Sequence, residues 1–311
     1  MSYLLDQCKY SPGVCNTSMN TNISVSAQGR PQPVDVDIVI PAYNEQRTLE
    51  NNIEALLDFL THQNRDCPVW TVVIADNAST DATWLVAREL CARHPDLVRA
   101  VHLDVKGRGL ALATTWSHSL AKVVAYMDVD LSTDLNDIGA LINPLLDGST
   151  DVTFGSRLLP QSEVVRSTKR EFISRAYNHM LHWYLDARFH DAQCGFKALT
   201  AQAAAQLLPR VSDNAWFFDT ELLLLAQYGN LRVREIPVHW VEDQNSTVDI
   251  LDTAWKDIQG MHRMKRELGI GSSDYERRHL SSRYSPLGWD AQGQRILPGS
   301  LLTMTKHEAR P

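Results

Sequence analysis

The chain has 311 residues, of which 44% are hydrophobic, and a formal net charge of -7. This composition is ordinary for a packed protein with one large domain or two small ones, and the negative charge argues against binding to bulk nucleic acid. A local basic patch could still receive an anionic substrate. The cysteines are odd in number and lack metal-type spacing, which favours a reduced cytoplasmic setting without a disulfide framework.

Both ends of the chain are predicted to be polar, disordered tails. Residues 1–34 are rich in Ser, Asn, Thr, Gln, Pro and Gly without periodicity, and residues 268–311 combine scattered charge with Gly and Pro. No run approaches the roughly 18 to 20 apolar residues of a membrane span, and the first thirty residues lack the apolar region of a signal peptide. Any membrane association is therefore expected to be peripheral.

Between the tails, β-branched runs alternate with amphipathic stretches, which is the pattern of a mostly parallel α/β sheet with helices on both faces. We predict one domain over residues 35–267, whose character changes after residue 156. Strands of the first part are predicted at 35–40, 69–75, 98–103, 122–128 and 151–155. Its helices are predicted at 45–62, 80–94, 108–120 and 134–147.

Polar loops follow the predicted strands of this first part. The first strand runs into Pro-Ala-Tyr-Asn-Glu (41–45), where a dinucleotide-binding protein would need Gly-x-Gly-x-x-Gly. The second strand ends at Asp76, whose carboxylate can accept a hydrogen bond from a nucleobase N–H. Lys106 and Gly107 then begin a helix and offer a cation and backbone amides to a phosphate or ribose.

The fourth predicted strand ends in two carboxylates, Asp128 and Asp130. Strand residues i and i+2 project to the same side, so both carboxylates can face one point at the carboxyl edge of the sheet, where ligands of open α/β sheets bind. Mg²⁺ and Mn²⁺ accept such oxygens and fill their remaining positions with water and phosphate oxygens. The pair predicts a site for metal and diphosphate, although Asp-rich turns also serve as simple helix caps.

In the second part, a long helix is predicted near 166–187, then a strand at 194–199, a helix near 217–228, a strand at 231–238 and a helix near 247–267. Basic residues gather around the long helix beside an apolar and aromatic stripe: Arg157, Arg166, Lys169, Arg170 and Arg175. Such a cluster suits a lipid phosphate at a membrane surface, or it is an ordinary core-facing helix with solvated charges. Lys197 could contact a phosphate or pair with a neighbouring acid.

Motifs in order along the chain resemble the inverting GT-A glycosyltransferases of family 2. They are Pro-Ala-Tyr-Asn-Glu (41–45), Ala-Asp-Asn-Ala-Ser (75–79), Lys-Gly-Arg-Gly-Leu-Ala (106–111), Met-Asp-Val-Asp (127–130) and Gly-Ser-Arg (155–157). Segments at 169–178, 191–197, 216–221 and 235–240 resemble the polyprenyl- or dolichyl-phosphate sugar synthases. The resemblance covers about residues 35–265 and implies a GT-A-like, Rossmann-like fold, with a nucleotide-sugar half (35–156) and an acceptor half (157–267) that carries an amphipathic helix.

The resemblance also implies roles for individual residues. The nucleotide sugar would be bound by Pro41, Tyr43, Glu45, Asp76, Lys106, Gly107 and Asp128. Asp128 and Asp130 would hold the metal, and Arg157, Arg170 and Lys197 would bind the acceptor, with Asp130, Arg157 and Arg170 acting in catalysis. Some relatives supply a Gln two residues after the second Asp, where this chain has Ser132, so metal ligation beyond Asp130 is open.

The implied reaction transfers a hexose from a nucleotide sugar to polyprenyl or dolichyl phosphate, with inversion and with Mg²⁺ or Mn²⁺. A phosphate acceptor is already largely ionised at neutral pH, so a protein base is unnecessary, and Asp219 and Glu221 are expected to orient the sugar or the basic residues. UDP-glucose is the first choice of donor and GDP-mannose the second.

The alternatives are a non-catalytic nucleotide-binding protein and a nucleotidyltransferase. The expected location is the cytoplasmic face of a membrane, and the sequence leaves open whether the chain forms a homo-oligomer.

Overall fold

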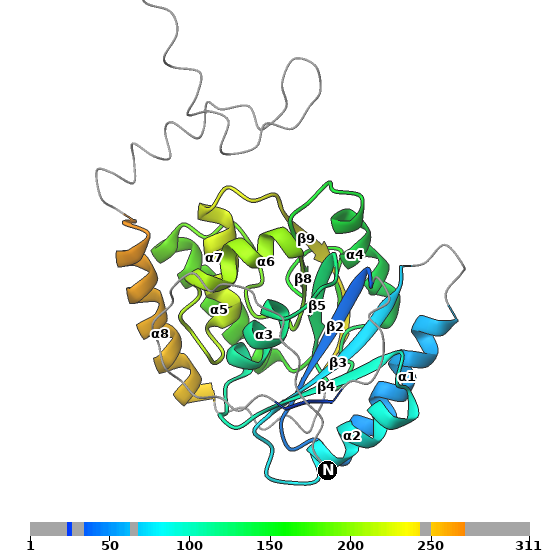
Figure 1. Ribbon diagram of the computed structural model, residues 1–311. Coiled ribbons are helices and arrows are strands. Elements are labelled where there is room, and N and C mark those ends of the chain that lie inside the picture. The colour runs from blue at the N-terminus through cyan, green and yellow to red at the C-terminus, as the bar shows by residue number, and fades with distance from the viewer. Residues whose placement is uncertain (1–23, 27–33, 63–67, 243–249, 271–311) are drawn as a thin grey trace, which may run out of the picture.

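The computed structural model describes residues 24–26, 34–62, 68–242 and 250–270 (Figure 1). Its centre is an eight-stranded sheet in the order β1-β4-β3-β2-β5-β8-β6-β9. The strands are β1 (Ser24–Ser26), β2 (Val36–Ala42), β3 (Trp70–Asn77), β4 (Val98–Leu103), β5 (Val123–Met127), β6 (Val152–Ser156), β8 (Phe196–Thr200) and β9 (Val233–Pro237). β1 pairs antiparallel with β4, β8 pairs antiparallel with β5 and β6, and the remaining pairs are parallel.

Helices cover both faces of this sheet (Figure 1). One face packs against α1 (Leu49–Thr61), α2 (Thr83–Arg93) and α4 (Ile138–Leu146), the last preceded by the 3₁₀ turn η1 (Leu135–Asp137). The other face packs against α3 (Arg108–Ser117), α5 (Thr168–Leu185), α6 (Ala201–Leu207) with the turn η2 (Leu208–Arg210), α7 (Phe218–Tyr228) and α8 (Ile250–Glu267). None of the helices in the described ranges is long and apolar enough to cross a membrane.

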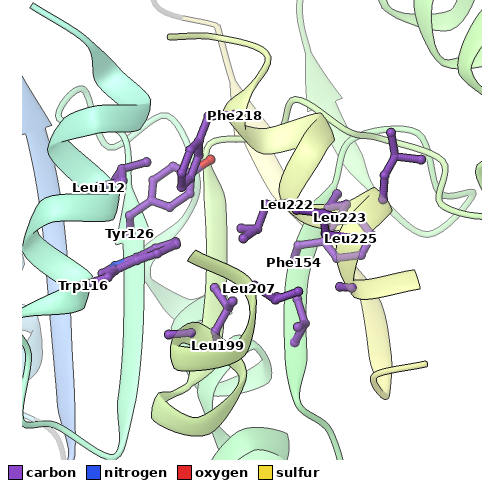
Figure 2. Packing of buried hydrophobic residues seen from close by; sticks show 14 of the residues in the cluster. Leu112, Trp116, Tyr126, Phe154, Leu199, Leu207, Phe218, Leu222, Leu223 and Leu225 are labelled. Carbon is purple, nitrogen blue, oxygen red and sulfur yellow. The ribbon is translucent and has the colours of Figure 1, made fainter. Parts of the chain in front are cut away.

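The two cores follow from the alternation of side chains along the strands. In β2, Val39 joins the core under α3, whereas Ile38 and Ile40 join the core under α1. Figure 2 shows the first of these cores, in which Trp116, Tyr126 and Phe218 lie together. This packing fixes α3 and α7 against β5, beside the end of the strand that carries Asp128.

A second, two-stranded sheet joins β7 (Glu163–Val165) to β10 (His239–Val241) in parallel. An isolated bridge pairs Thr133, after β5, with Trp240 in β10. The small sheet therefore connects the end of the central strand to the start of α5.

The predicted strands and helices lie within a few residues of the observed ones, with two corrections. The prediction of a disordered tail is wrong for Ser24–Ser26, which pair with β4 as β1. The helix predicted at 134–147 divides into η1 and α4. β8 runs antiparallel between β5 and β6, within the mostly parallel sheet that was predicted. No predicted element corresponds to β7, α6 or β10. The rest of the N-terminal tail, except the last residue, and residues 271–311 lie outside the described ranges.

Candidate active site at the carboxyl edge of the sheet

Parallel strands β2, β3 and β5 end at the same edge of the sheet, so their loops converge. Ala42 stands opposite Asp76 in the β2–β3 pairing, and β5 flanks β2 on its other side. Pro41 lies in β2 itself, opposite Ala75. The predicted nucleotide residues of these loops thus lie along one edge, as expected for an open α/β sheet.

The loops after β2 and β3 are joined by hydrogen bonds. Asn44, in the left-handed conformation with a φ of 57°, donates its amide to Ser79 Oγ at 3.0 Å and accepts the amide of Thr80 at 2.8 Å. The amide of Glu45 donates to Thr83 Oγ1 at 2.7 Å. These bonds fix the backbone that positions the neighbouring Tyr43 ring.

Tyr43 and Lys106 lie together, because the Lys106 ammonium is 3.5 Å from the centre of the Tyr43 ring. Asp76, at the end of β3, is buried and contacts His102 Nδ1 at 2.5 Å. The Gly107 amide, which was expected to be available to a phosphate, donates instead to Asn77 Oδ1 at 2.6 Å. Gly107 therefore fixes the start of α3.

Asp128 lies between a guanidinium and a glycine. Its Oδ1 accepts from Arg108 at 2.8 Å, and its amide donates to the carbonyl of Gly195 at 3.2 Å. A Cβ placed on Gly195 would lie only 1.7 Å from Asp128 Oδ2. Glycine at position 195 is thus a steric requirement of this carboxylate position.

Asp130 is exposed on the loop that follows, and its Oδ1 accepts from the amide of Ser132 at 3.0 Å. The next residue, Leu131, has a φ of 51°, an uncommon conformation for a non-glycine residue. The hydroxyl oxygen of Ser132 is buried without a hydrogen-bond partner among the described residues. No group of three or more His, Cys, Asp or Glu side chains in the described part of the chain is arranged to hold a metal.

Arg108 connects Asp128 to a buried network of charged groups. Its second amino group contacts Asp219 Oδ2 at 2.6 Å, and its guanidinium lies over the rings of Tyr126 and Trp216. Asp219 also accepts from the Tyr126 hydroxyl and pairs with Lys197 at 3.0 Å. Burial alone would raise the pKa of Asp219, but Lys197 and Arg108 lower it below its usual range. Asp219 is therefore a carboxylate held by two cations.

Lys197 is fully buried. Besides Asp219, its ammonium contacts the carbonyl of Cys194 at 2.6 Å and the Tyr126 hydroxyl at 3.4 Å. Of the two roles considered for Lys197, the structure shows the pair with an acid. Asp219 and Glu221 were expected to orient the sugar or the basic residues. Asp219 contacts Lys197 and Arg108, whereas Glu221 binds Arg263, which was not among those basic residues, with both oxygens, at 2.6 and 2.9 Å.

The two arginines predicted to bind the acceptor each have an acidic partner. Arg157 binds the buried Asp191 through Nε and a terminal nitrogen, at 2.8 and 2.9 Å. Burial alone would lower the pKa of Arg157, but Asp191 raises it, and Asp128 is among the charges that add to this effect. Arg170, in the first turn of α5, contacts Glu242 at 2.9 Å.

Sequence reasoning did not assign Arg108, His102, Asp191 or Gly195 to the site. Arg108 was visible as a second cation at a helix start, and Asp191 and Gly195 stood in a recognised segment. Nothing in the spacing indicated that these side chains meet Asp76, Asp128 and Arg157, because the contacts join elements far apart in the sequence.

Comparisons with known proteins identify relatives of this chain. A family model described as glycosyl transferase family 2 matches residues 37–208. The chain is 31% identical over 223 residues to the dolichyl-phosphate beta-glucosyltransferase of Mus musculus, covering 68% of both chains. It is 36% identical over 229 residues to glycosyltransferase AglD of Haloferax volcanii, covering 73% of this chain but only 36% of that relative.

A solved structure shares the fold. Glucosyl-3-phosphoglycerate synthase from Mycobacterium tuberculosis, in complex with Mn²⁺, UDP-glucose and phosphoglyceric acid, matches with a TM-score of 0.56 at 16% identity. The match covers 79% of this chain and 88% of that one. At this identity the likeness concerns the fold alone.

Proposed function

Because the chain belongs to glycosyltransferase family 2, we propose that it transfers one glucose residue from UDP-glucose to a polyprenyl or dolichyl phosphate. The observation that carries this proposal is the carboxyl edge of the sheet, where Asp128, bound by Arg108, lies on the same edge as Tyr43 and Asp76. The names of the mouse and human relatives support the sugar and the lipid. Their β-linked product requires inversion, because UDP-glucose is the α anomer.

On the donor side, Asp76 would bind the base, and Tyr43 with Lys106 would line the nucleotide pocket together with Pro41 and Glu45. Arg108 fixes one oxygen of Asp128 and is itself fixed by Asp219. Its guanidinium is therefore preorganised beside the place proposed for the diphosphate, where positive charge stabilises a leaving group.

The donor set at this edge fits a hard divalent cation. Asp130 is exposed, and Gly195 allows the Asp128 carboxylate to lie where a Cβ would otherwise be. The Ser132 hydroxyl oxygen, which has no hydrogen-bond partner among the described residues, lies on the same loop. Mg²⁺ or Mn²⁺ uses one or two carboxylates and completes its shell with water and phosphate oxygens. We propose that Asp128 and Asp130 hold such an ion, which would neutralise charge on the nucleoside diphosphate.

The proposed chemistry is a single displacement. An ionised oxygen of the lipid phosphate attacks C1 of glucose, the bond from C1 to the diphosphate oxygen breaks, and UDP leaves with the bonding electrons. Arg157 and Arg170 would hold the attacking phosphate, so that the protein mainly contributes position and charge. Asp219 is poorly suited to accept a proton, because Lys197 and Arg108 lower its pKa and both of its oxygens already have partners. Lys197 is assigned to this network rather than to the acceptor.

The first test is the release of nucleoside diphosphate from a panel of UDP- and GDP-sugars with Mg²⁺ or Mn²⁺, with and without polyprenyl phosphate. Lipid-dependent release from UDP-glucose is the expected result. Lipid-dependent release from GDP-mannose would change the donor, and release of pyrophosphate would indicate a nucleotidyltransferase. Absence of release from every donor would overturn the proposal in favour of a binding protein.

The Arg170→Ala variant should raise the KM for lipid phosphate by about tenfold or more, since an arginine–phosphate contact is charge-assisted. The KM for UDP-glucose should change little, because Arg170 lies at the start of α5 and not in the nucleotide loops. Steady-state kinetics with each substrate varied in turn measure both values. An effect confined to the nucleotide sugar would reassign Arg170 to the donor.

We also propose that the outer faces of α5 and α8 meet the membrane. The two helices lie side by side, joined by a 2.6 Å contact between Tyr184 and His262 (Figure 1). Their exposed aromatic residues are Phe172, Trp183 and Trp255. Large exposed aromatics beside cations such as Arg175 are typical of helices that lie at a lipid interface. We assign this contact to the cytoplasmic face of the membrane.

The Trp183→Ser variant should bind anionic lipid vesicles several-fold more weakly than the wild type in a sedimentation assay. Leu120 provides a matched control, because it is 85% exposed but precedes β5, at the edge opposite Asp128. Leu120→Ser should bind like the wild type. Equal losses in the two variants, or no loss in either, would contradict the proposed membrane face.

A further inference from the structure

Residues 239–242 comprise β10 and Glu242. They contact Arg157, Arg170 and the loop that follows Asp130. They belong to or follow the segment at 235–240, to which the proposed reaction gives no role. This stretch also lies beyond residues 37–208, which the family model matches. Its contacts account for the placement of both arginines that would bind the acceptor.

Arg157 is held from two sides by this part of the chain. The Trp240 ring lies 5.4 Å from the guanidinium carbon of Arg157, within the range of a cation–π contact. On the other side, Glu235 in β9 accepts the backbone amides of His190 and Asp191, at 3.0 and 3.1 Å. Asp191 in turn grips the Arg157 guanidinium. The segment therefore leaves Arg157 little freedom to change its direction.

Arg170 is held by Glu242. Glu242 Oε1 contacts Arg170 Nε at 2.9 Å, and its Oε2 accepts the amide of Ser167, the N-cap residue of α5, at 2.7 Å. The side chain of Glu242 is only 15% exposed, so this carboxylate is largely shielded from solvent. Its amide also donates to the carbonyl of Val165 in β7 at 2.9 Å. Glu242 thus ties Arg170, the start of α5 and the small sheet together.

The same residues grip the loop that follows Asp130. The amide of Val241 donates to the carbonyl of Ser132, and the amide of Asp134 donates to the carbonyl of His239, both at 2.9 Å. The amide of His239 donates to Asp137 Oδ2 at 2.7 Å. The loop that follows Asp130 and the two arginines therefore all contact the same short segment, residues 239–242.

We propose that Trp240 and Glu242 are positioning residues that hold Arg157 and Arg170 at a fixed place relative to the Asp130 loop. The inference rests on the proposed function, in which the acceptor phosphate must line up with C1 and the leaving diphosphate. In such a displacement a misplacement of about 1 Å can cost on the order of a hundredfold in rate. Because β10 and Glu242 contact both the two arginines and the Asp130 loop, they would set the distance between the acceptor phosphate and the diphosphate.

The test compares Glu242→Gln with a control in the same small sheet. Glu242→Gln keeps the side-chain shape but weakens the charge-assisted bond to Arg170, so the KM for polyprenyl phosphate should rise about tenfold. The KM for UDP-glucose should stay within about twofold. Glu163→Gln is the control, because Glu163 lies in β7 and its side chain is 81% exposed. It should leave both constants unchanged.

A double-mutant cycle separates positioning from a general structural effect. In an Arg170→Ala background, Glu242→Gln should raise the KM for lipid phosphate no further, because the group it positions is gone. On the Trp240 side, Trp240→Phe keeps an aromatic ring near Arg157 and should give a smaller increase than Trp240→Leu.

The outcomes distinguish this inference from the proposed function. Absence of lipid-dependent release by the wild-type chain from every donor would defeat the proposed function itself. If the wild type is active but Glu242→Gln matches Glu163→Gln, or raises both KM values equally, the positioning role is overturned. Additive effects of Glu242→Gln and Arg170→Ala would overturn it as well.

Discussion

The Asp130→Asn variant should lose about 10²- to 10³-fold in turnover while keeping the fold of the wild type. The substitution removes a formal charge from a proposed metal ligand, and an amide is a much weaker ligand for Mg²⁺ or Mn²⁺ than a carboxylate. The fold should survive because Asp130 is exposed, and an asparagine oxygen can still accept the amide of Ser132. Turnover at saturating UDP-glucose and lipid phosphate, with a denaturation curve for each protein, measures both effects.

Asp134→Asn is the matched control for this variant. Asp134 is an exposed carboxylate on the same loop, where its Oδ1 accepts the amide of Asn136 at 2.8 Å and caps η1. An asparagine can still cap this turn, so turnover should remain within about twofold of the wild type. Unchanged turnover in a folded Asp130→Asn protein would remove Asp130 from the metal site.

The nucleotide half could be predicted in some detail because its signals are local. The strand that ends just before Asp128 is a buried apolar run, and its direction places the carboxylates at the ligand-binding edge. The loops at 41–45 and after Asp76 could be placed at the same edge by the same argument. Each of these inferences needed only a few neighbouring residues and the rule that parallel strands end together.

The acceptor half was harder to predict because its organisation depends on contacts between distant segments. A period of two residues looks the same in a parallel and an antiparallel strand, so the sequence could not show that β8 reverses direction between β5 and β6. The three-residue strands β7 and β10 are largely exposed and carry no apolar alternation that would reveal them. These strands matter because they connect the loop after β5 to the start of α5, and this connection can be seen only in the folded structure.

The sequence also could not predict which charged residues pair with one another. Lys197 follows Cys-Gly-Phe in a segment that supports either a phosphate contact or an ion pair. In the folded protein, α7 packs so that Asp219 contacts Lys197 in β8, and both charges are buried. The ion pair is therefore the role that the fold selects. A buried ammonium needs a partner, whereas an exposed one does not, so burial was the missing information.

The Lys197→Met variant should lower the free energy of unfolding by about 3 kcal/mol, because it leaves the buried Asp219 with one cation instead of two. Lys122→Met is the control, since Lys122 pairs with Asp35 at a shorter distance, 2.7 Å, but is 73% exposed. Its loss should cost about 0.5 kcal/mol or less, because exposed ion pairs contribute little. Chemical denaturation of both variants tests whether burial, rather than distance, determines the contribution of an ion pair.

The same Lys197→Met variant separates the two roles considered for this lysine. If Lys197 serves the buried network, the variant should lose stability, and its KM for lipid phosphate should change less than that of Arg170→Ala. A direct contact with the acceptor predicts the reverse, a large rise in that KM with little loss of stability. The first pattern is expected, because the Lys197 ammonium is fully buried and already contacts Asp219, Tyr126 and the Cys194 carbonyl.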